Sequence, residues 1–193
     1  RNSATSDGGG VFSFDTFIMN GGEISENYAG SCGGGAYFEF NKSFEMNGGT
    51  FADNTAERHG GGISSITDPR KANTFFKLDI REGTFTGNTA LKGSGGAIFW
   101  YDGRAYLVNC TITGNSAPKG YGGGVYFPKA CGKACFTGTV IVTGNTALTD
   151  RPDNVSNFFA ESETDFNNSD GKPEKYSKYD NSNYEPTKHE YIE

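Results

Sequence analysis

Acidic side chains with a base nearby are the residues of this 193-residue chain that could do catalytic chemistry. Enzymes that cleave polysaccharides need clustered carboxylates, usually with an Arg or Lys, on one exposed strand face. The candidates are Glu23, Glu26, Asp53, Asp79, Glu82, Asp102 and Arg104. No repeat unit carries two acids and a base at positions that the next unit repeats, so solvated charges at strand edges explain them better than a catalytic site.

Histidines and cysteines are too sparse for a metal centre, and no cofactor motif is found. His59 and His189 each stand without a second histidine or cysteine nearby and are expected at the surface. Cys131 and Cys135 are four residues apart and could close a local disulfide, as is common in oxidising compartments. Free thiols at these two positions, or a metal, remain the alternatives.

The elements that position these residues are set by an internal repeat. An Asn-x-Ala phrase recurs six times, and after the first five copies a glycine run follows six or seven residues beyond the Asn. The six asparagines are Asn2, Asn27, Asn54, Asn88, Asn115 and Asn145. A period of this length is typical of a solenoid, in which each repeat shares a thin apolar interior with its neighbours.

Alternating apolar residues, such as Phe44 and Met46 or Leu78 and Ile80, indicate half-buried strands, and no segment has a helical period. We therefore expect an all-β fold, a right-handed parallel β-helix of about six short coils of three strands. It should span residues 1–159. Residues 160–193 are polar and are expected to form a C-terminal tail, either a cap or disordered.

Stacked coils place equivalent residues about 4.8 Å apart, so the six asparagines should form a hydrogen-bonded ladder at one corner of the coil. An Asn at a corner tolerates left-handed backbone, and the glycine run supplies positive φ at the next corner. The same stacking separates Cys32 from Cys110 by three coils, on the order of 14 Å, so these two should not be bonded to each other.

Aromatic residues follow the apolar residue of the glycine strand in most repeats, at Phe12, Tyr37, Phe99 and Tyr126. If their neighbours point inward, these side chains alternate outward and stack. They would then either stabilise the ladder or form a flat face that binds a glycan or another protein.

The net charge of −6 gives no support for a nucleic-acid partner, and no apolar run of about 18 residues could span a bilayer. The chain opens in mid-phrase, so we expect that residues upstream of Arg1 were removed or are not included. Asn41 and Asn167 begin sequons and are possible glycan sites, whereas the sequon at Asn109 is expected inside a strand.

Two signatures, Gly95-Gly-Ala-Ile98 and Phe-x-x-Asn at Phe51–Asn54 and Phe85–Asn88, resemble the repeats of chlamydial polymorphic outer-membrane proteins. Similar repeats occur in bacterial surface proteins with pectin-lyase-like folds. The resemblance covers about residues 2–155 and implies a surface-displayed, adhesin-like β-helix. It departs at Ile24, Ile112 and Val142, which replace the Phe, and in the third glycine of most runs.

We therefore expect a non-enzymatic extracellular or cell-surface module, structural or adhesin-type, that binds a host or matrix protein or a glycan. One alternative is a subunit that assembles head to tail into an extracellular filament through its open coil ends. A second alternative is a polysaccharide-active enzyme.

Overall fold

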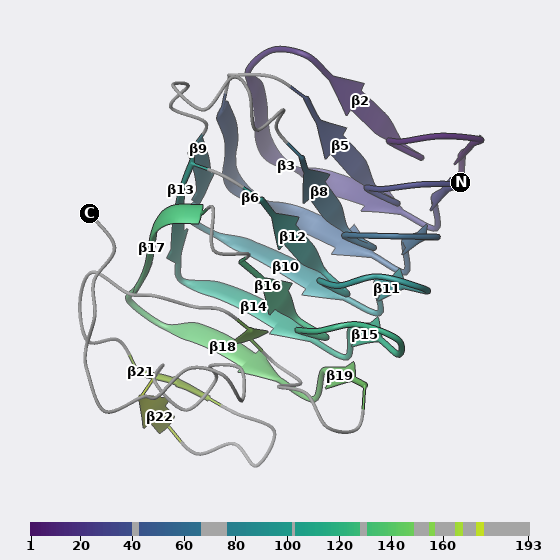
Figure 1. The fold of residues 1–193 in the computed structure, drawn as a ribbon. Coiled ribbons are helices and arrows are strands. Elements are labelled where there is room, and N and C mark those ends of the chain that lie inside the picture. Colours follow the sequence, from purple (N-terminus) through teal and green to yellow (C-terminus); the bar gives the residue numbers. More distant parts are fainter. Residues whose placement is uncertain are drawn as a thin grey trace.

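The computed structural model describes residues 1–39, 43–66, 77–101, 103–127, 131–148, 155–156, 165–167 and 173–175. Within these ranges only the backbone is described for residues 131–137 and from 155 onward. The described residues contain strands and no helix, and the strands of successive repeats pair in parallel. The molecule is a parallel β-helix (Figure 1).

Three sheets run the length of the solenoid. Sheet A consists of two-residue strands that follow each ladder asparagine: β1 (Ser3–Ala4), β4 (Tyr28–Ala29), β7 (Thr55–Ala56), β11 (Thr89–Ala90), β15 (Ser116–Ala117) and β19 (Thr146–Ala147). Sheet B follows the glycine runs: β2 (Val11–Ser13), β5 (Ala36–Phe38), β8 (Ile63–Ser65), β12 (Ile98–Trp100), β16 (Val125–Tyr126) and β20 (Val155–Ser156). Six strands in a sheet are separated by five turns, so complete coils are slightly fewer than the six expected.

Sheet C has two legs with a bend between them. Its strands are β3 (Phe17–Ser25), β6 (Ser43–Ala52), β9 (Lys77–Ile80), β10 (Gly83–Thr86), β13 (Gly103–Val108), β14 (Cys110–Thr113), β17 (Cys131–Thr137), β18 (Val140–Thr143), β21 (Asp165–Asn167) and β22 (Pro173–Lys175). The start of β6 pairs with β9 and its end pairs with β10. We call the β9, β13, β17 side the first leg and the β10, β14, β18 side the second leg.

The three sheets confirm a coil of three sides, and the bend divides the third side into two legs. In β3 and β6 the bend falls at paired glycines, where Gly22 has φ 88° and Gly49 has φ 114°. In the next three coils the chain breaks into separate strands at this point, and Asn109, between β13 and β14, has φ 49°. A left-handed residue turns the chain without a long loop.

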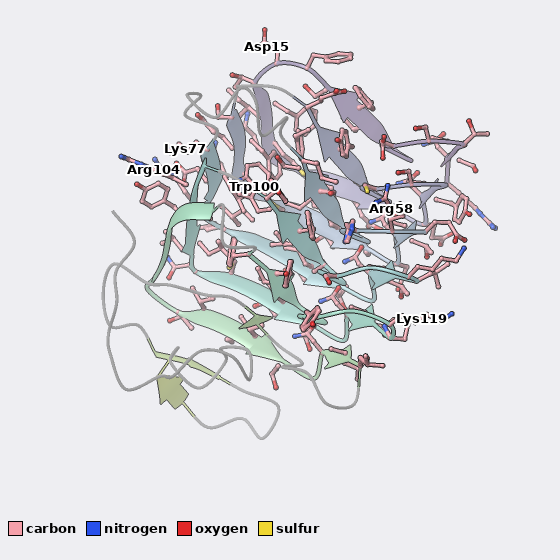
Figure 2. The ribbon with its side chains drawn as sticks, in the orientation of Figure 1. Asp15, Arg58, Lys77, Trp100, Arg104 and Lys119 are labelled. Atoms are coloured by element: carbon pink, nitrogen blue, oxygen red, sulfur yellow. The ribbon has the colours of Figure 1, made fainter. Side chains whose placement is uncertain are left out.

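The core lies inside the coils and is built from stacked apolar residues. Phe51 and Phe85 occupy the same place in successive coils and stack with ring centroids 5.2 Å apart and planes 2° from parallel. Leu78 and Ile80 point inward from β9, and Trp100 is fully buried at the end of β12 (Figure 2). Outward residues of the same strands are then free to carry function.

The glycine runs serve two different needs. Gly60, the first of its run, has φ 63°, as expected for this corner. At Gly61, a Cβ atom would lie 2.4 Å from the backbone nitrogen of Thr89 in the next coil. The second glycine is therefore required by close packing between coils.

Two short strands extend sheet C beyond the repeats. β21 pairs in parallel with β18, and β22 pairs antiparallel with β21. The rest of residues 160–193 lies outside the described residues, so the boundary at 159/160 and the nature of the tail stay predictions.

Candidate binding groove on the first leg of sheet C

A groove of about 710 Å³ lies on the outer face of the first leg. Its described lining comes from β9, β13 and the residues that follow them: Lys77, Asp79, Arg81, Glu82, Arg104, Tyr106, Val108 and Asn109. Alternation along the strands explains the lining, because Leu78 and Ile80 point into the core and their neighbours point out. The described lining of the groove therefore comes from the strands of the first leg and the residues that follow them.

Asp79 is held between two cations. Its Oδ2 accepts from Lys77 Nζ at 2.7 Å and from Arg81 Nη2 at 3.2 Å, and its side chain is 7% exposed. Burial alone raises the pKa of Asp79, but the hydrogen bonds from Lys77 and Arg81 outweigh burial and hold the pKa below its ordinary value. Asp79 therefore stays ionised and fixes the two cationic side chains in place.

Cationic residues also stack from coil to coil. Arg104 pairs in register with Lys77 on one side and with Lys133 on the other. The backbone thus sets three basic residues at about 4.8 Å intervals along the solenoid axis. Like charges directly opposite each other in a sheet are destabilising, so this arrangement is not explained by its contribution to the stability of the sheet. Lys77 and Arg104 point outward together (Figure 2).

Tyr106 lies beside the basic residues, in register with Asp79. Its ring is half-buried, and the Lys77 Nζ is 5.8 Å from the ring centroid. The described lining therefore combines three cationic side chains and two carboxylates with one aromatic surface.

Asp79, Glu82 and Arg104 are candidates from the sequence, but their common place in one groove is seen only in the structure. The register between β9 and β13 could not be read from the sequence, because the segments before these strands differ in length from repeat to repeat. The alternating Lys-x-Asp-x-Arg pattern of residues 77–81 was the available signal. Asp102, the candidate acid next to Arg104 in the sequence, lies outside the described residues.

The asparagine ladder runs through the described coils without a break. The Oδ1 atom of each asparagine accepts the backbone N–H and the Nδ2–H of the asparagine in the preceding coil, from Asn2–Asn27 to Asn115–Asn145. Each side chain from Asn54 to Asn145 also donates to a backbone carbonyl of the second leg, as Asn88 Nδ2 does to Phe51 O at 2.9 Å. The repeated asparagines are structural.

The asparagine was expected to have the left-handed backbone at this corner. The structure places that conformation at the residue before it. Glu26 and Asp53 have φ 55° and 54°, and Gly87, Gly114 and Gly144 occupy the same place in later coils. The asparagine itself adopts a strand-compatible backbone, which lets its side chain point inward to the ladder.

The aromatic residues of sheet B stack in register, with Phe12 opposite Tyr37 and Phe99 opposite Tyr126. Their ring centroids are 5.3 Å and 5.5 Å apart, respectively. They do not form an open face, because Tyr37 is 7% and Phe99 4% exposed, whereas Phe12 is 42% exposed. Residues of the preceding turns cover them, as His59 does with its ring centroid 4.3 Å from that of Phe99. A binding role for these four residues stays a prediction.

His59 is part of this cover and is not the free surface residue expected. Its Nδ1 accepts the backbone N–H of Ser94 at 3.1 Å. Burial, then the neighbouring Arg58 charge, lower the pKa of His59 to about 4. The neutral ring is therefore the folded form. His189 lies outside the described residues.

Cys32 and Cys110 are both buried free thiols, which confirms that they are not bonded to each other. Burial raises the pKa of both, that of Cys110 to about 12. Cys131 and Cys135 lie within one strand, β17. Four residues of extended strand place their Cα atoms about 13 Å apart. Their side chains lie outside the described residues, so their disulfide stays a prediction, and it would require β17 to break.

Asn109 is exposed at the bend between β13 and β14, and not inside a strand as expected. Its Oδ1 accepts the backbone N–H of Thr139 at 2.9 Å. Asn41 lies outside the described residues, and so does the side chain of Asn167. Glycosylation at these two sites stays a prediction.

Comparison with known families adds one finding. Residues 82–99 and 109–128 match the family model of the Chlamydia polymorphic membrane protein (Chlamydia_PMP) repeat. The expected resemblance is confirmed. Each matched segment covers the second leg, the Asn corner and the start of sheet B. The chain matches no curated protein and no solved structure at a significant level.

The groove lies largely outside the matched repeat. Lys77, Asp79 and Arg81 precede the first matched segment, and Arg104, Tyr106 and Val108 lie between the two. The match therefore covers scaffold positions and only Glu82 and Asn109 of the groove lining.

The described residues contain no helix long and apolar enough to cross a membrane. They also contain no group of three or more His, Cys, Asp or Glu side chains that could hold a metal ion.

Proposed function

We propose that this β-helix is a non-enzymatic module of a cell-surface or extracellular protein and that it binds a host or matrix partner through the first-leg groove. The observation that carries the proposal is the in-register basic residues Lys77 and Arg104 beside Tyr106. The repeated asparagines, glycines and inward apolar residues are all engaged in the scaffold, so the outer faces remain to provide function.

The resemblance to a membrane-protein repeat supports the surface location. A β-helix is also suited to display, because stacked coils form a rigid rod whose faces repeat at a fixed spacing. Antibody labelling of intact cells of the source organism tests the location. Labelling only after permeabilisation would exclude surface display.

An adhesion assay tests the groove. Beads coated with residues 1–193 are added to epithelial cell layers and to immobilised extracellular matrix. Arg104→Gln should reduce attachment, whereas Arg58→Gln, which removes the same charge from an exposed arginine on another side of the solenoid, should not (Figure 2). Equal attachment by the Arg104→Gln variant and the unchanged protein would refute a role for the groove.

Binding without cleavage is supported by the state of Asp79. A general acid must hold a proton that it can give, and Asp79 is kept ionised by Lys77 and Arg81. We expect no release of reducing ends or unsaturated products from acidic or neutral polysaccharides. Product formation that Asp79→Asn abolishes would establish the enzyme alternative.

Head-to-tail assembly stays a prediction. Sedimentation velocity of residues 1–193 over a range of concentrations measures it, and a monomer at all concentrations would exclude it.

A further inference from the structure

We infer that the groove binds an anionic polysaccharide, one carrying carboxylate or sulfate groups, with the sugar chain lying along the solenoid axis. The inference rests on the proposed function and names the ligand class of the same site. It follows from the spacing of the basic residues, the rigidity of the Asp79 cluster and the place of Tyr106.

The first step is the direction of the positive charge. Lys77, Arg104 and Lys133 occupy one register position in three successive coils, so the line that joins them runs across the strands. A ligand that meets the described Lys77 and Arg104 side chains must therefore lie perpendicular to the strands, with anionic groups about 4.8 Å apart or a multiple of it.

A polysaccharide and a peptide differ in how well their repeat distances match the spacing of the coils. A pyranose unit in an extended polysaccharide has nearly the length of the coil spacing, so successive units meet successive coils. An extended peptide advances about 3.3 Å per residue, and its side chains return to the same face about every 6.6 Å. The repeat of an acidic peptide, about 6.6 Å, therefore does not match the spacing of Lys77 and Arg104.

The third step is rigidity. Asp79 fixes the Lys77 ammonium at 2.7 Å and the Arg81 guanidinium at 3.2 Å before any ligand arrives. The Arg81 side chain remains 66% exposed and the Lys77 side chain 40%, so both can still reach a ligand. Cations that are already ordered lose less side-chain entropy on binding.

The fourth step is the aromatic surface. Tyr106 lies in the register position next to Arg104 and Lys77 and lines the groove. The apolar face of a sugar ring packs on an aromatic side chain, while the charged substituents at its edge reach the neighbouring cations. A simple inorganic anion would use the cations and not Tyr106.

The overall charge sharpens the inference. The chain carries a net charge of −6, which repels polyanions at long range. Binding to an acidic polysaccharide must then depend on the local basic residues, and it should weaken as salt screens them.

Binding assays on the whole chain test the inference with four probes: a heparin oligosaccharide, an oligogalacturonate, neutral dextran and polyglutamate. The variants are Arg104→Gln, Tyr106→Leu and the control Arg58→Gln. We expect one or both acidic sugars to bind more tightly than polyglutamate, and dextran not to bind. Comparison of the heparin and galacturonate probes distinguishes sulfate from carboxylate recognition.

Arg104→Gln should weaken binding of the acidic sugar by about tenfold, the loss typical of one hydrogen bond to a charged group. Tyr106→Leu should also weaken it without changing its salt dependence, and Arg58→Gln should leave it unchanged. Thermal unfolding of each variant verifies that it folds. A loss that is equal for Arg104→Gln and Arg58→Gln would overturn the inference, as would polyglutamate binding as tight as that of the sugars.

The inference and the proposed function fail in different ways. If no acidic sugar binds and Arg104→Gln still lowers bead attachment, the ligand class is wrong and the groove remains the partner surface. If Arg104→Gln changes neither sugar binding nor attachment, both are wrong.

Discussion

Replacing Asn88 by Ala removes the centre of the asparagine ladder. The Asn88 side chain is fully buried, and its Oδ1 accepts from the Asn54 backbone N–H at 3.1 Å and from Asn54 Nδ2 at 3.0 Å. Its Nδ2 donates to Asn115 Oδ1 and to Phe51 O, each at 2.9 Å. The Asn54 side chain retains a bond to Ile24 O, but the Asn54 backbone N–H loses the partner it has in the ladder.

The expected cost follows from these bonds. A buried donor left without a partner costs about 1–3 kcal/mol, and each further hydrogen bond contributes about 1 kcal/mol net. Asn88→Ala should therefore lower the free energy of unfolding by about 3–5 kcal/mol, a large share of the 5–15 kcal/mol typical of a folded domain. Asn88→Asp should cost at least as much, since it places a carboxylate against the Asn115 and Phe51 oxygens.

Urea unfolding followed by circular dichroism and by Trp100 fluorescence measures the cost, and agreement of the two signals checks for two-state behaviour. The matched control is Asn47→Ala, because Asn47 donates to Asn20 Oδ1 at 2.9 Å from an exposed position. The control should change stability by less than about 0.5 kcal/mol. If the two alanine variants lose the same stability, the ladder contributes nothing beyond a surface contact and the reasoning is refuted.

Three further predictions concern the corners and the cover of sheet B. Glu26→Gly should stabilise the protein by about 0.5–1 kcal/mol in urea, because Glu26 is exposed with φ 55°; an unchanged midpoint would mean that its backbone is unstrained. Gly114→Ala should lower stability by only about 1 kcal/mol, because Gly114 has φ 66° but an added Cβ would meet nothing closer than 4.0 Å. Gly61→Ala should lower stability by more than about 3 kcal/mol, because its Cβ would clash with the next coil. Stability should fall as pH drops from about 6.5 to about 4, because His59 is neutral in the folded protein with a lowered pKa, while the unfolded ring takes up a proton. The loss of stability is at most about 3 kcal/mol and should disappear in His59→Asn. If the loss persists in that variant, other groups cause it.

The scaffold could be predicted from the sequence because its determinants are local and repeated. Asn54 and Asn88 occur in the same phrase, and identical spacing between coils makes their contact almost inevitable once the solenoid is assumed. The first glycine of each run could also be assigned, since a positive φ is a property of a single residue. These features need no knowledge of distant contacts.

The groove could not be predicted in the same way. Lys77 and Arg104 become neighbours only through the register of β9 and β13, and the residues that precede these strands differ in length. The cover over Phe99 was missed for a related reason, because alternation along a strand gives the side on which a residue lies and not what packs over that side. The division of the third side into two legs depended on the left-handed backbone at Asn109, which its sequon context did not reveal.

Stacking of separately paired coils has a mechanical consequence. Successive ladder asparagines such as Asn27 and Asn54 are 27 residues apart, and each coil is held to the next by its own set of strand pairs and ladder bonds. Under tension between the two ends, coils of 25 to 34 residues should peel away one at a time, each releasing roughly 80–120 Å of extended chain. Every release lets the force fall before the next coil is loaded. A rod of this kind dissipates a sudden pull in small steps.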